Sequence, residues 1–245
     1  YGEALETADK IMTYKLTVKT IAKRHGLYAS FMPKPKYGMC GSGMHINMSL
    51  FNKEGQNIFV DENDKNGLSK EAYNFIAGLM KHMRSMTAII NPIVNSYKRL
   101  VPGYEAPTYI AWSATNRSPL IRVPAARGLG TRVELRSPDC ATNPYLAIAV
   151  CLAAGLDGIK NNLQPVDSIQ RDIYSMTDEE RDEAGIENLP KNLYEAIQEM
   201  RKSDFVKGVL GKEVFKKYIK AKEEEWMEYT SQVTDWEIDR YLGRI

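Results

Sequence analysis

The sequence predicts an α+β fold in which a sheet of short strands is flanked by helices, with a helical C-terminal region over residues 161–245. Polar and apolar residues alternate in residues 43–51 and again in 131–136, a pattern typical of strands with one buried face. Longer segments bounded by capping residues, glycine or proline predict helices.

The N-terminal segment is predicted to form a helix followed by a strand. Thr7 is a candidate N-cap, apolar residues recur after it at helical spacing, and Gly26 ends the helix. Residues 27–32 then predict a strand that is closed by Pro33.

Residues 43–51 predict a strand with two chemically different faces. Side chains on one face are polar: His45, Asn47 and Ser49. Side chains on the other face are apolar: Met44, Ile46, Met48 and Leu50. The strand follows Gly41-Ser42-Gly43, a turn whose backbone can approach a ligand closely. A polar turn over residues 52–56 then leads to a predicted strand at 57–60.

Helix signals cover much of the remaining chain. The segments are a helix from the Ser69 cap to about Ile90, an apolar helix over 145–159 opened by Pro144, a capping box at 177–180, and helices at 191–202 and 213–229. The 145–159 helix is apolar nearly all round, so we expect it to be buried.

Further strands are predicted at residues 109–112, 120–123 and 131–136. In the last of these, Arg132, Glu134 and Arg136 share one face. A charge-paired solvent face is one interpretation of that pattern, and a structural histidine is one interpretation of His45.

Arginine is dense between Asn91 and Arg136, where the only acids are Glu105 and Glu134. The six arginines are Arg99, Arg117, Arg122, Arg127, Arg132 and Arg136. They stand among prolines, aromatic residues and β-branched residues, so rigid backbone presents planar donors. This arrangement suits a phosphate or carboxylate ligand.

The composition bounds the class of protein. The 245 residues are 43% hydrophobic and 26% charged, which is typical of a globular protein, and the net charge of +2 argues against a general nucleic-acid binder. No segment approaches the ~20 apolar residues that span a bilayer. Cys40, Cys140 and Cys151 lack CxxC spacing and fit a reducing, cytoplasmic location.

Several long motifs together carry a family resemblance. They are Gly41-Ser42-Gly43-Met44-His45, Asn91-Pro92 with residues 95–107, Asn116-Arg117-Ser118, residues 132–136, Asn143-Pro144-Tyr145-Leu146 and residues 153–159. They closely resemble the catalytic domain of type I glutamine synthetase, the bacterial and archaeal form, over nearly the whole chain. The resemblance implies a curved antiparallel sheet flanked by helices, the fold shared with guanido kinases, with residues 1–245 in one catalytic domain.

The resemblance also implies a reaction. In that family ATP phosphorylates the γ-carboxylate of L-glutamate, and ammonia then displaces phosphate to give glutamine. Positioned positive charge suits phosphoryl transfer, and a carboxylate with an imidazole suits Mg²⁺ or Mn²⁺. We therefore expect a ligase that uses ATP, glutamate, ammonia and one of these metals.

The matching residues fall into groups by implied role. The implied metal ligands are His45 and Glu134. The implied glutamate site comprises Gly41, Arg99, Glu105 and Arg136, and the implied ATP site comprises Asn47, Ser49, Arg117, Arg122 and Arg132. Glu105, Arg117 and Arg136 would be catalytic, with Glu105 closing as a lid and drawing a proton from ammonium. Without the resemblance, a loop acid paired with Arg99 is the favoured interpretation of Glu105.

Some positions depart from the family pattern. Cys40 stands where many members have Asn, Asn47 replaces a His found in some, and residues 126–130 lack a lysine that some place near the nucleotide. Arg127 has no implied role. Tyr174 lies near a position that some members adenylylate, although an ordinary loop or interface tyrosine is the favoured interpretation.

The chain begins at Tyr1 with no Met and no apolar signal core, so we expect an interior piece of a longer polypeptide. The resemblance places a β-grasp domain and most of the metal-binding glutamates upstream. It also implies active sites between adjacent subunits of a dodecamer made of two hexameric rings. We therefore expect residues 1–245 alone to be inactive.

Other functions compete with glutamine synthesis. A ligase that joins glutamate to a polyamine or another amine differs in residues upstream of this chain. A non-catalytic homologue kept for assembly or regulation would be expected to lose His45, Glu134 or the phosphate-side arginines, and all are present. An arginine-rich RNA-binding module would show steeply salt-dependent affinity for unrelated RNAs.

Overall fold

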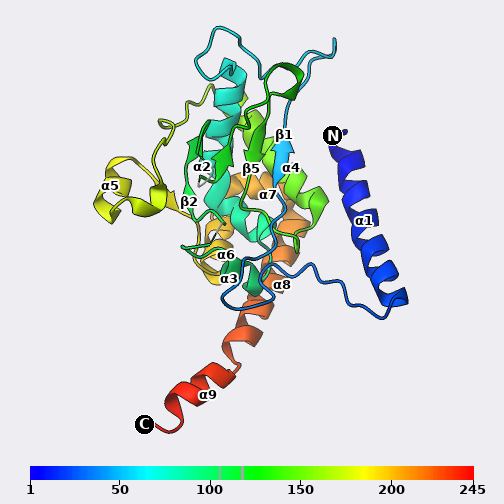
Figure 1. The fold of residues 1–245 in the computed structure, drawn as a ribbon, viewed down its shortest axis with the longest axis vertical. Helices are drawn as coiled ribbons and strands as arrows, with labels where there is room; N and C mark the ends of the chain where they lie inside the picture. The colour runs from blue at the N-terminus through cyan, green and yellow to red at the C-terminus, as the bar shows by residue number, and fades with distance from the viewer. Residues whose placement is uncertain (105, 117–118) are drawn as a thin grey trace.

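The computed structural model describes residues 1–104, 106–116 and 119–245. Its mixed architecture confirms the α+β prediction, because a small sheet lies against a group of helices (Figure 1). The first helix and the last lie at the periphery of the molecule. Within the described residues, every helix is too short or too polar to cross a membrane.

The helices mostly begin at the predicted caps. They are α1 (Ala4–Arg24), α2 (Lys70–Ile90), α3 (Val94–Arg99), α4 (Pro144–Lys160), α5 (Asp178–Glu183), α6 (Leu193–Arg201), α7 (Asp204–Leu210), α8 (Lys212–Thr230) and α9 (Asp235–Tyr241). Ser69 caps α2, Asn143 caps α4, and Thr177 with Glu180 forms the capping box of α5. The sequence does not predict α3, α7 or α9.

The strands are shorter than the alternating patterns suggest. They are β1 (Ile46–Met48), β2 (Tyr109–Ile110), β3 (Trp112–Ser113), β4 (Ile121–Arg122), β5 (Val133–Leu135) and β6 (Glu187–Asn188). The described strands of the main sheet follow the order β1-β5-β4-β3, and β2 pairs with β6. β5 is antiparallel to both neighbours, whereas β3 and β4 are parallel, so the sheet is antiparallel at its centre and mixed at one edge.

Two predicted strands are wrong. Residues 27–32 form no strand pairing within the described residues, and Leu27 and Tyr28 stay exposed because no strand lies beside them. Residues 57–60 make isolated bridges instead of a strand. The predicted turn over 52–56 is present, closed by a bond of 3.0 Å from the amide of Asn52 to the carbonyl of Gln56.

Two helices differ from their predictions in extent or burial. α1 begins at Ala4 rather than at Thr7, because the amide of Thr7 already bonds the carbonyl of Glu3. α4 is buried on one side only, and Tyr145 and Leu156 are exposed on the other. An all-apolar sequence therefore overstates the burial of this helix.

The centre of the molecule is the contact between α2 and α4. A β-carbon on Gly158 would lie 2.0 Å from the carbonyl oxygen of Asn74, and one on Gly78 would lie 2.1 Å from that of Ala154. Only glycine permits this separation of the two backbones. The apolar face of β5 packs into the same core, so the helix pair supports the sheet.

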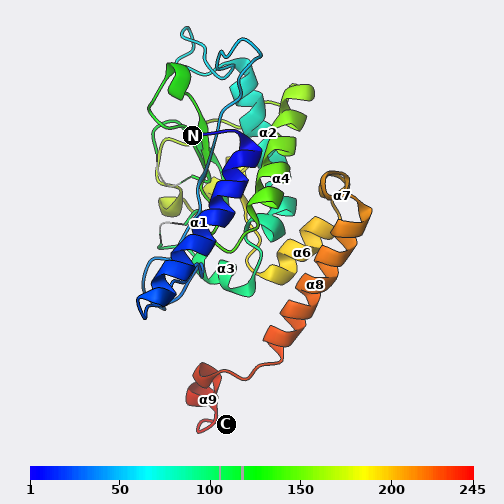
Figure 2. The same ribbon diagram turned by 90° about the vertical axis from the view of Figure 1, so that its right-hand side faces the viewer.

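The C-terminal helices extend the structure away from the sheet. α6 packs against α2, α7 packs against α4, and α8 packs against α6 and α7. α8 then leads to α9, which lies apart from the body of the chain (Figure 2). Trp236 and Leu242 are exposed in and just after α9.

Candidate active site

The polar face of β1, β5 and β4 carries the first group of predicted site residues. The registers align Asn47 with Glu134 and Glu134 with Arg122, so a row of polar side chains crosses three strands. His45 lies on the same face of the chain just before β1, and its Nδ1 lies 3.0 Å from Oε1 of Glu134. The predicted separation of polar and apolar faces is therefore present.

Glu134 is the centre of this row. Its second oxygen, Oε2, accepts a hydrogen bond of 3.0 Å from Nη1 of Arg122. Burial alone would raise the pKa of the Glu134 carboxyl, but the hydrogen bonds from Arg122 and His45 bring that pKa below its ordinary value. The carboxylate is therefore ionised at neutral pH.

His45 has the opposite electrostatic setting. Burial lowers the pKa of its imidazole, the hydrogen bond to Glu134 opposes that change, and the charge of Arg136 adds to the lowering. A neutral imidazole beside an ionised carboxylate is the protonation state that a metal requires.

The spacing of these two side chains fits a divalent cation. Neighbouring ligands of an octahedral Mg²⁺, each at about 2.1 Å, lie about 3.0 Å apart. That separation equals the 3.0 Å between His45 Nδ1 and Glu134 Oε1. Within the described residues, His, Cys, Asp and Glu form no group of three or more that could hold a metal, and this pair alone is smaller than such a group.

A small cavity of about 100 Å³ opens beside His45. Its lining residues are Cys40, Gly41, Gly43, His45, Arg99, Tyr104, Ala106 and Arg136. Gly41, Arg99 and Arg136 were all predicted for the glutamate site from widely separated motifs. The fold brings these three together next to the candidate metal ligand.

Arg99 is held rigidly at the base of this cavity. It is 5% exposed, and its guanidinium donates to the carbonyl of Ser137 at 2.7 Å and to that of Arg136 at 3.2 Å. Burial lowers the pKa of Arg99, and the nearby charge of Asp139 opposes that lowering. With both contacts on carbonyl oxygens, the positive charge of Arg99 stays available to an anion in the cavity.

The glycine turn lies directly against Arg99. A β-carbon on Gly43 would lie 2.4 Å from Nη2 of Arg99, and one on Gly41 would lie 2.3 Å from the carbonyl oxygen of Pro33. The turn therefore needs both glycines in order to pass between the Arg99 guanidinium and the backbone before it.

A buried polar network holds the backbone that Arg99 contacts. Asn91 donates to the carbonyl of Ser137 at 2.8 Å and to Oδ2 of Asp139 at 2.9 Å. Asp139 is fully buried, and burial raises its pKa although the hydrogen bonds from Asn91 and Ser96 oppose the rise. The same Asp139 pairs with Gly43 in a β-bridge, so the network joins the turn to the end of α2.

The predicted nucleotide residues lie further along the strand face. Nε of Arg132 donates to Oδ1 of Asn47 at 3.0 Å, and Ser49 is exposed beyond Asn47. Arg122 is engaged with Glu134, as described above. Asn47, Arg132 and Arg122 therefore lie on the same face of the sheet as Glu134.

Arg127 has a structural role. Its Nη1 donates to the carbonyls of Pro124 and Ala126, at 2.5 and 3.0 Å, and its side chain packs over Gly67. It therefore fastens the loop between β4 and β5. Glu105 and Arg117, both predicted as catalytic, lie outside the described residues.

The sequence patterns miss residues that support the cavity. Asn91, Asp139 and Lys34 are buried polar side chains within or beside it. Lys34 stands between Pro33 and Pro35, and a lysine in a proline-bounded segment is the signal that could have marked it. The Asn91-Pro92 motif includes Asn91 but assigns it no role.

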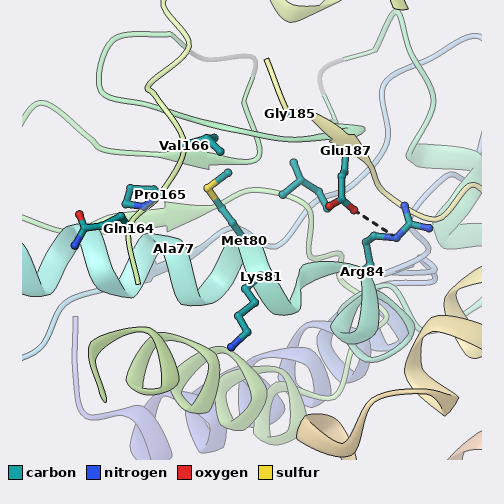
Figure 3. A pocket seen from close by; sticks show the side chains of 10 residues that line it. Ala77, Met80, Lys81, Arg84, Gln164, Pro165, Val166, Gly185 and Glu187 are labelled. Atoms are coloured by element: carbon teal, nitrogen blue, oxygen red, sulfur yellow. Dashed lines mark ion pairs between the residues drawn. The ribbon is translucent and has the colours of Figure 1, made fainter. Parts of the chain in front are cut away.

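A larger cavity, of about 220 Å³, lies elsewhere, between α2 and residues 164–187. Figure 3 shows Arg84 turned toward Glu187 in its wall, with 3.8 Å between Nε and Oε2. Lys81, also in the wall, is paired with Asp157 at 3.2 Å. None of the predicted site residues lines this cavity, and its cations already face carboxylates.

Residues 1–241 match the model of a protein family described as glutamine synthetase, catalytic domain. The chain belongs to the glutamine synthetase family. Curated glutamine synthetases agree with it at 63% identity over 244 residues in Clostridium saccharobutylicum, at 56% over 245 residues in Methanosarcina mazei and at 54% over 242 residues in Staphylococcus aureus. These alignments include 99–100% of this chain and 54–55% of each relative, so the chain spans about half the length of these glutamine synthetases.

Solved structures with the glutamine synthetase catalytic fold agree with this assignment. One described as "Apo GmaS without ligand" has a TM-score of 0.87 and 40% identity, covering 98% of this chain and 54% of its own. Another, described as "GmaS/ADP complex-Conformation 1", has a TM-score of 0.88 and 39% identity, covering 99% of this chain and 56% of its own. The fold therefore matches proteins of the same family almost throughout.

Proposed function

We propose that the full-length protein is a glutamate–ammonia ligase, a glutamine synthetase that joins ammonia to the γ-carboxylate of L-glutamate with hydrolysis of ATP. The observation that carries this proposal is the contact of one carboxylate, Glu134, with both His45 and Arg122, at 3.0 Å each. A candidate cation ligand pair and a phosphate-binding arginine thereby meet beside a cavity lined by Arg99 and Arg136. Membership of the glutamine synthetase family supports the same reaction.

The two sides of the site suit the two substrates. Arg99 and Arg136 would bind glutamate with the backbone of Gly41, while Arg122, Arg132, Asn47 and Ser49 would face ATP, and Arg117 would join them. The γ-carboxylate of glutamate would then attack the terminal phosphorus of ATP, forming γ-glutamyl phosphate and ADP. Rigid arginines favour this step because they neutralise developing charge without having to reorganise.

His45 and Glu134 would hold Mg²⁺ or Mn²⁺ at the boundary between these sides. When bound, the cation would neutralise phosphate charge and orient the transferring group. Arg122 remains on the second oxygen of Glu134, so it fixes the carboxylate that faces the metal.

The second step requires a free amine. Glu105 is proposed to draw a proton from ammonium, and ammonia then displaces phosphate from the intermediate to give glutamine. Exclusion of water during this step protects the acyl phosphate from hydrolysis.

The remaining parts of the site are proposed to lie outside this chain. The chain spans about half of its curated relatives, and its two metal-ligand candidates form an incomplete set within the described residues. Further metal-binding glutamates, and a dodecamer in which adjacent subunits share each site, would complete it. A cytoplasmic location agrees with the three free cysteines.

A ligase for another amine is the second candidate. The GmaS structures, at 39–40% identity, show that this fold extends beyond the relatives named glutamine synthetase, which are 54–63% identical to this chain. The higher identities favour ammonia.

The test is a hydroxamate-forming assay on the full-length protein, with ammonia, hydroxylamine and polyamines as competing acceptors. Ammonia is expected to compete best, and Glu134→Ala to abolish product. Glu213→Ala, which removes an exposed carboxylate of α8 paired with Lys217, is the matched control and should retain full activity. Unchanged activity of Glu134→Ala would refute the role of Glu134, and preference for a polyamine would favour the second candidate.

A further inference from the structure

Two side chains from distant parts of the sequence hold the residues on either side of Glu105. On one side, the Lys34 ammonium lies over the ring of Tyr104, 3.6 Å from its centroid. On the other, the hydroxyl of Tyr174 donates a hydrogen bond of 3.0 Å to the carbonyl of Ala106. Tyr104 and Ala106 both line the small cavity.

Lys34 is fixed in place by several contacts. It is 8% exposed, which is rare for lysine, and its Nζ also donates to the carbonyl of Met39. Its backbone is held by Asn95, which accepts from the Lys34 amide at 2.7 Å and donates to the Lys34 carbonyl at 3.0 Å. The ammonium therefore lies at a defined position between Tyr104 and the segment that leads into the glycine turn.

The contact of Lys34 with Tyr104 has the form of a strong cation–π interaction. The interaction gains strength when the cation is removed from water, and Lys34 is buried. Among the described residues, the Lys34 ammonium contacts the Tyr104 ring face and the carbonyl oxygen of Met39, so its charge positions these two groups.

Tyr174 is fixed as well, in the short 3-10 helix Ile173–Ser175. Its ring packs edge-on against Tyr109 with 5.6 Å between the centroids, and its amide donates to Oδ1 of Asp172 at 3.1 Å. The ring is half-buried, and the hydroxyl reaches Ala106 from a position 68 residues away in the sequence. The bond ties the loop after α4 to the cavity wall.

We infer that Lys34 and Tyr174 are a pair of positioning residues that hold the wall of the small cavity at Tyr104 and Ala106, a cavity that Arg99 and Arg136 also line. The inference rests on the proposed function, in which this cavity binds glutamate for the amine step. Neither residue touches a reacting atom in this scheme. Each acts by restraining one residue of the cavity wall.

The test uses Lys34→Met and Tyr174→Phe in the full-length protein, alone and together. Lys34→Met removes the cation, and we expect kcat/KM for ammonium and for glutamate to fall about tenfold. Tyr174→Phe removes one hydroxyl and keeps the ring, and we expect a fall of about threefold. The KM for ATP should stay within about twofold, because the nucleotide face is separate.

Two substitutions provide matched controls. Tyr218→Phe removes a tyrosine hydroxyl that also donates to an alanine carbonyl, that of Ala88 at 2.7 Å, away from the cavity. Lys98→Met removes a lysine that lies over the ring of Tyr229 at 5.5 Å. Both should leave all kinetic constants unchanged. Lys34→Arg keeps a cation at the position and should restore most of the activity lost in Lys34→Met.

The double variant tests whether the two contacts restrain one shared part of the cavity wall or act independently. Loss of either contact frees the same segment, so the double variant should lose less than the product of the two single losses. Hydrogen exchange of peptides covering 101–108 gives a readout that does not need activity. Exchange should accelerate in Lys34→Met and Tyr174→Phe, and stay unchanged in the two controls.

The outcomes separate this inference from the proposed function. If the parent protein forms no glutamine, the proposed function fails, and the exchange data still decide whether the two side chains hold the wall. The positioning role is overturned if the parent is active but both variants keep the parental kcat/KM for ammonium and glutamate. It is also overturned if kcat/KM for ATP falls as much as kcat/KM for these two substrates. Unchanged exchange over 101–108 in both variants would overturn it as well.

Discussion

The side-chain oxygen of Asn47 accepts a hydrogen bond of 3.0 Å from Nε of Arg132, which joins β1 to the residue just before β5. Both side chains lie on the solvent side of the strands, beyond the contact between His45 and Glu134. Asn47 therefore sets the direction in which the Arg132 guanidinium points.

Asn47→Ala should weaken nucleotide binding without affecting glutamate. Loss of one hydrogen bond to a charged group predicts a rise of about five- to tenfold in the KM for ATP. The KM for glutamate should not change, because Arg99 and Gly41 are held independently. Asn52→Ala, in the polar turn after β1, is the control. An ATP KM equal to that of the parent would show that Arg132 needs no support from Asn47.

Gly43→Ala should damage the glutamate side of the site. The added β-carbon would lie 2.4 Å from Nη2 of Arg99, so the guanidinium must move from its two carbonyl acceptors. Misplacing a charged hydrogen-bonding group predicts a loss of about tenfold or more in apparent glutamate affinity. Steady-state kinetics with glutamate varied at saturating ATP measures the effect. A parental glutamate KM would mean that Arg99 does not bind this substrate.

The sequence predicted the polar face of the sheet because strand alternation is a local property. His45, Asn47 and Glu134 could be assigned to the polar faces of their strands without knowledge of the fold. The strand lengths and the parallel pairing of β3 with β4 could not be assigned, since neighbours in the sheet decide them. Residues 27–32 illustrate the same limit, because a strand-like composition gives no strand without a partner.

The contacts that hold the cavity wall could not be predicted from local sequence patterns, because they join residues far apart in the chain. Arg99 bonds a carbonyl 38 residues away, and Tyr174 bonds one 68 residues away, so no spacing rule links them. Lys34 has the composition of a surface residue and is buried only because Tyr104 and Met39 surround its ammonium. The motifs marked the candidate site residues, and the fold shows which contacts hold them.

Gly158→Ala should destabilise the whole domain. The new β-carbon would lie 2.0 Å from the carbonyl oxygen of Asn74 in α2, a backbone atom that cannot rotate away. Overpacking of this kind costs about 1–3 kcal/mol, which thermal unfolding should register as a lower Tm. Gly208→Ala in α7 meets no atom within 4 Å and should raise stability by about 0.5–1 kcal/mol. Equal stability of the two variants would refute the close contact of α2 and α4.

The three cysteines should react with iodoacetamide in a fixed order. Cys40 is exposed in the cavity wall and should react first. Burial raises the pKa of the half-buried Cys140, which should react more slowly. Burial raises the pKa of Cys151 to about 12, so at pH 8 its thiol is protonated and should react only after unfolding. Mass spectrometry of timed digests measures the order, and early labelling of Cys151 in native protein would contradict its burial.

The lateral alignment of Asn47, Glu134 and Arg122 makes the site sensitive to chain length within the strands as well as to residue type. Successive strand residues point to opposite sides, so deletion of one residue from β5 would turn Glu134 inward and bring Val133 or Leu135 to the ligand side. Conservative substitutions on this face should therefore retain more activity than deletion of a single residue from the strand. Insertions and deletions in related chains should accordingly fall outside β1, β4 and β5.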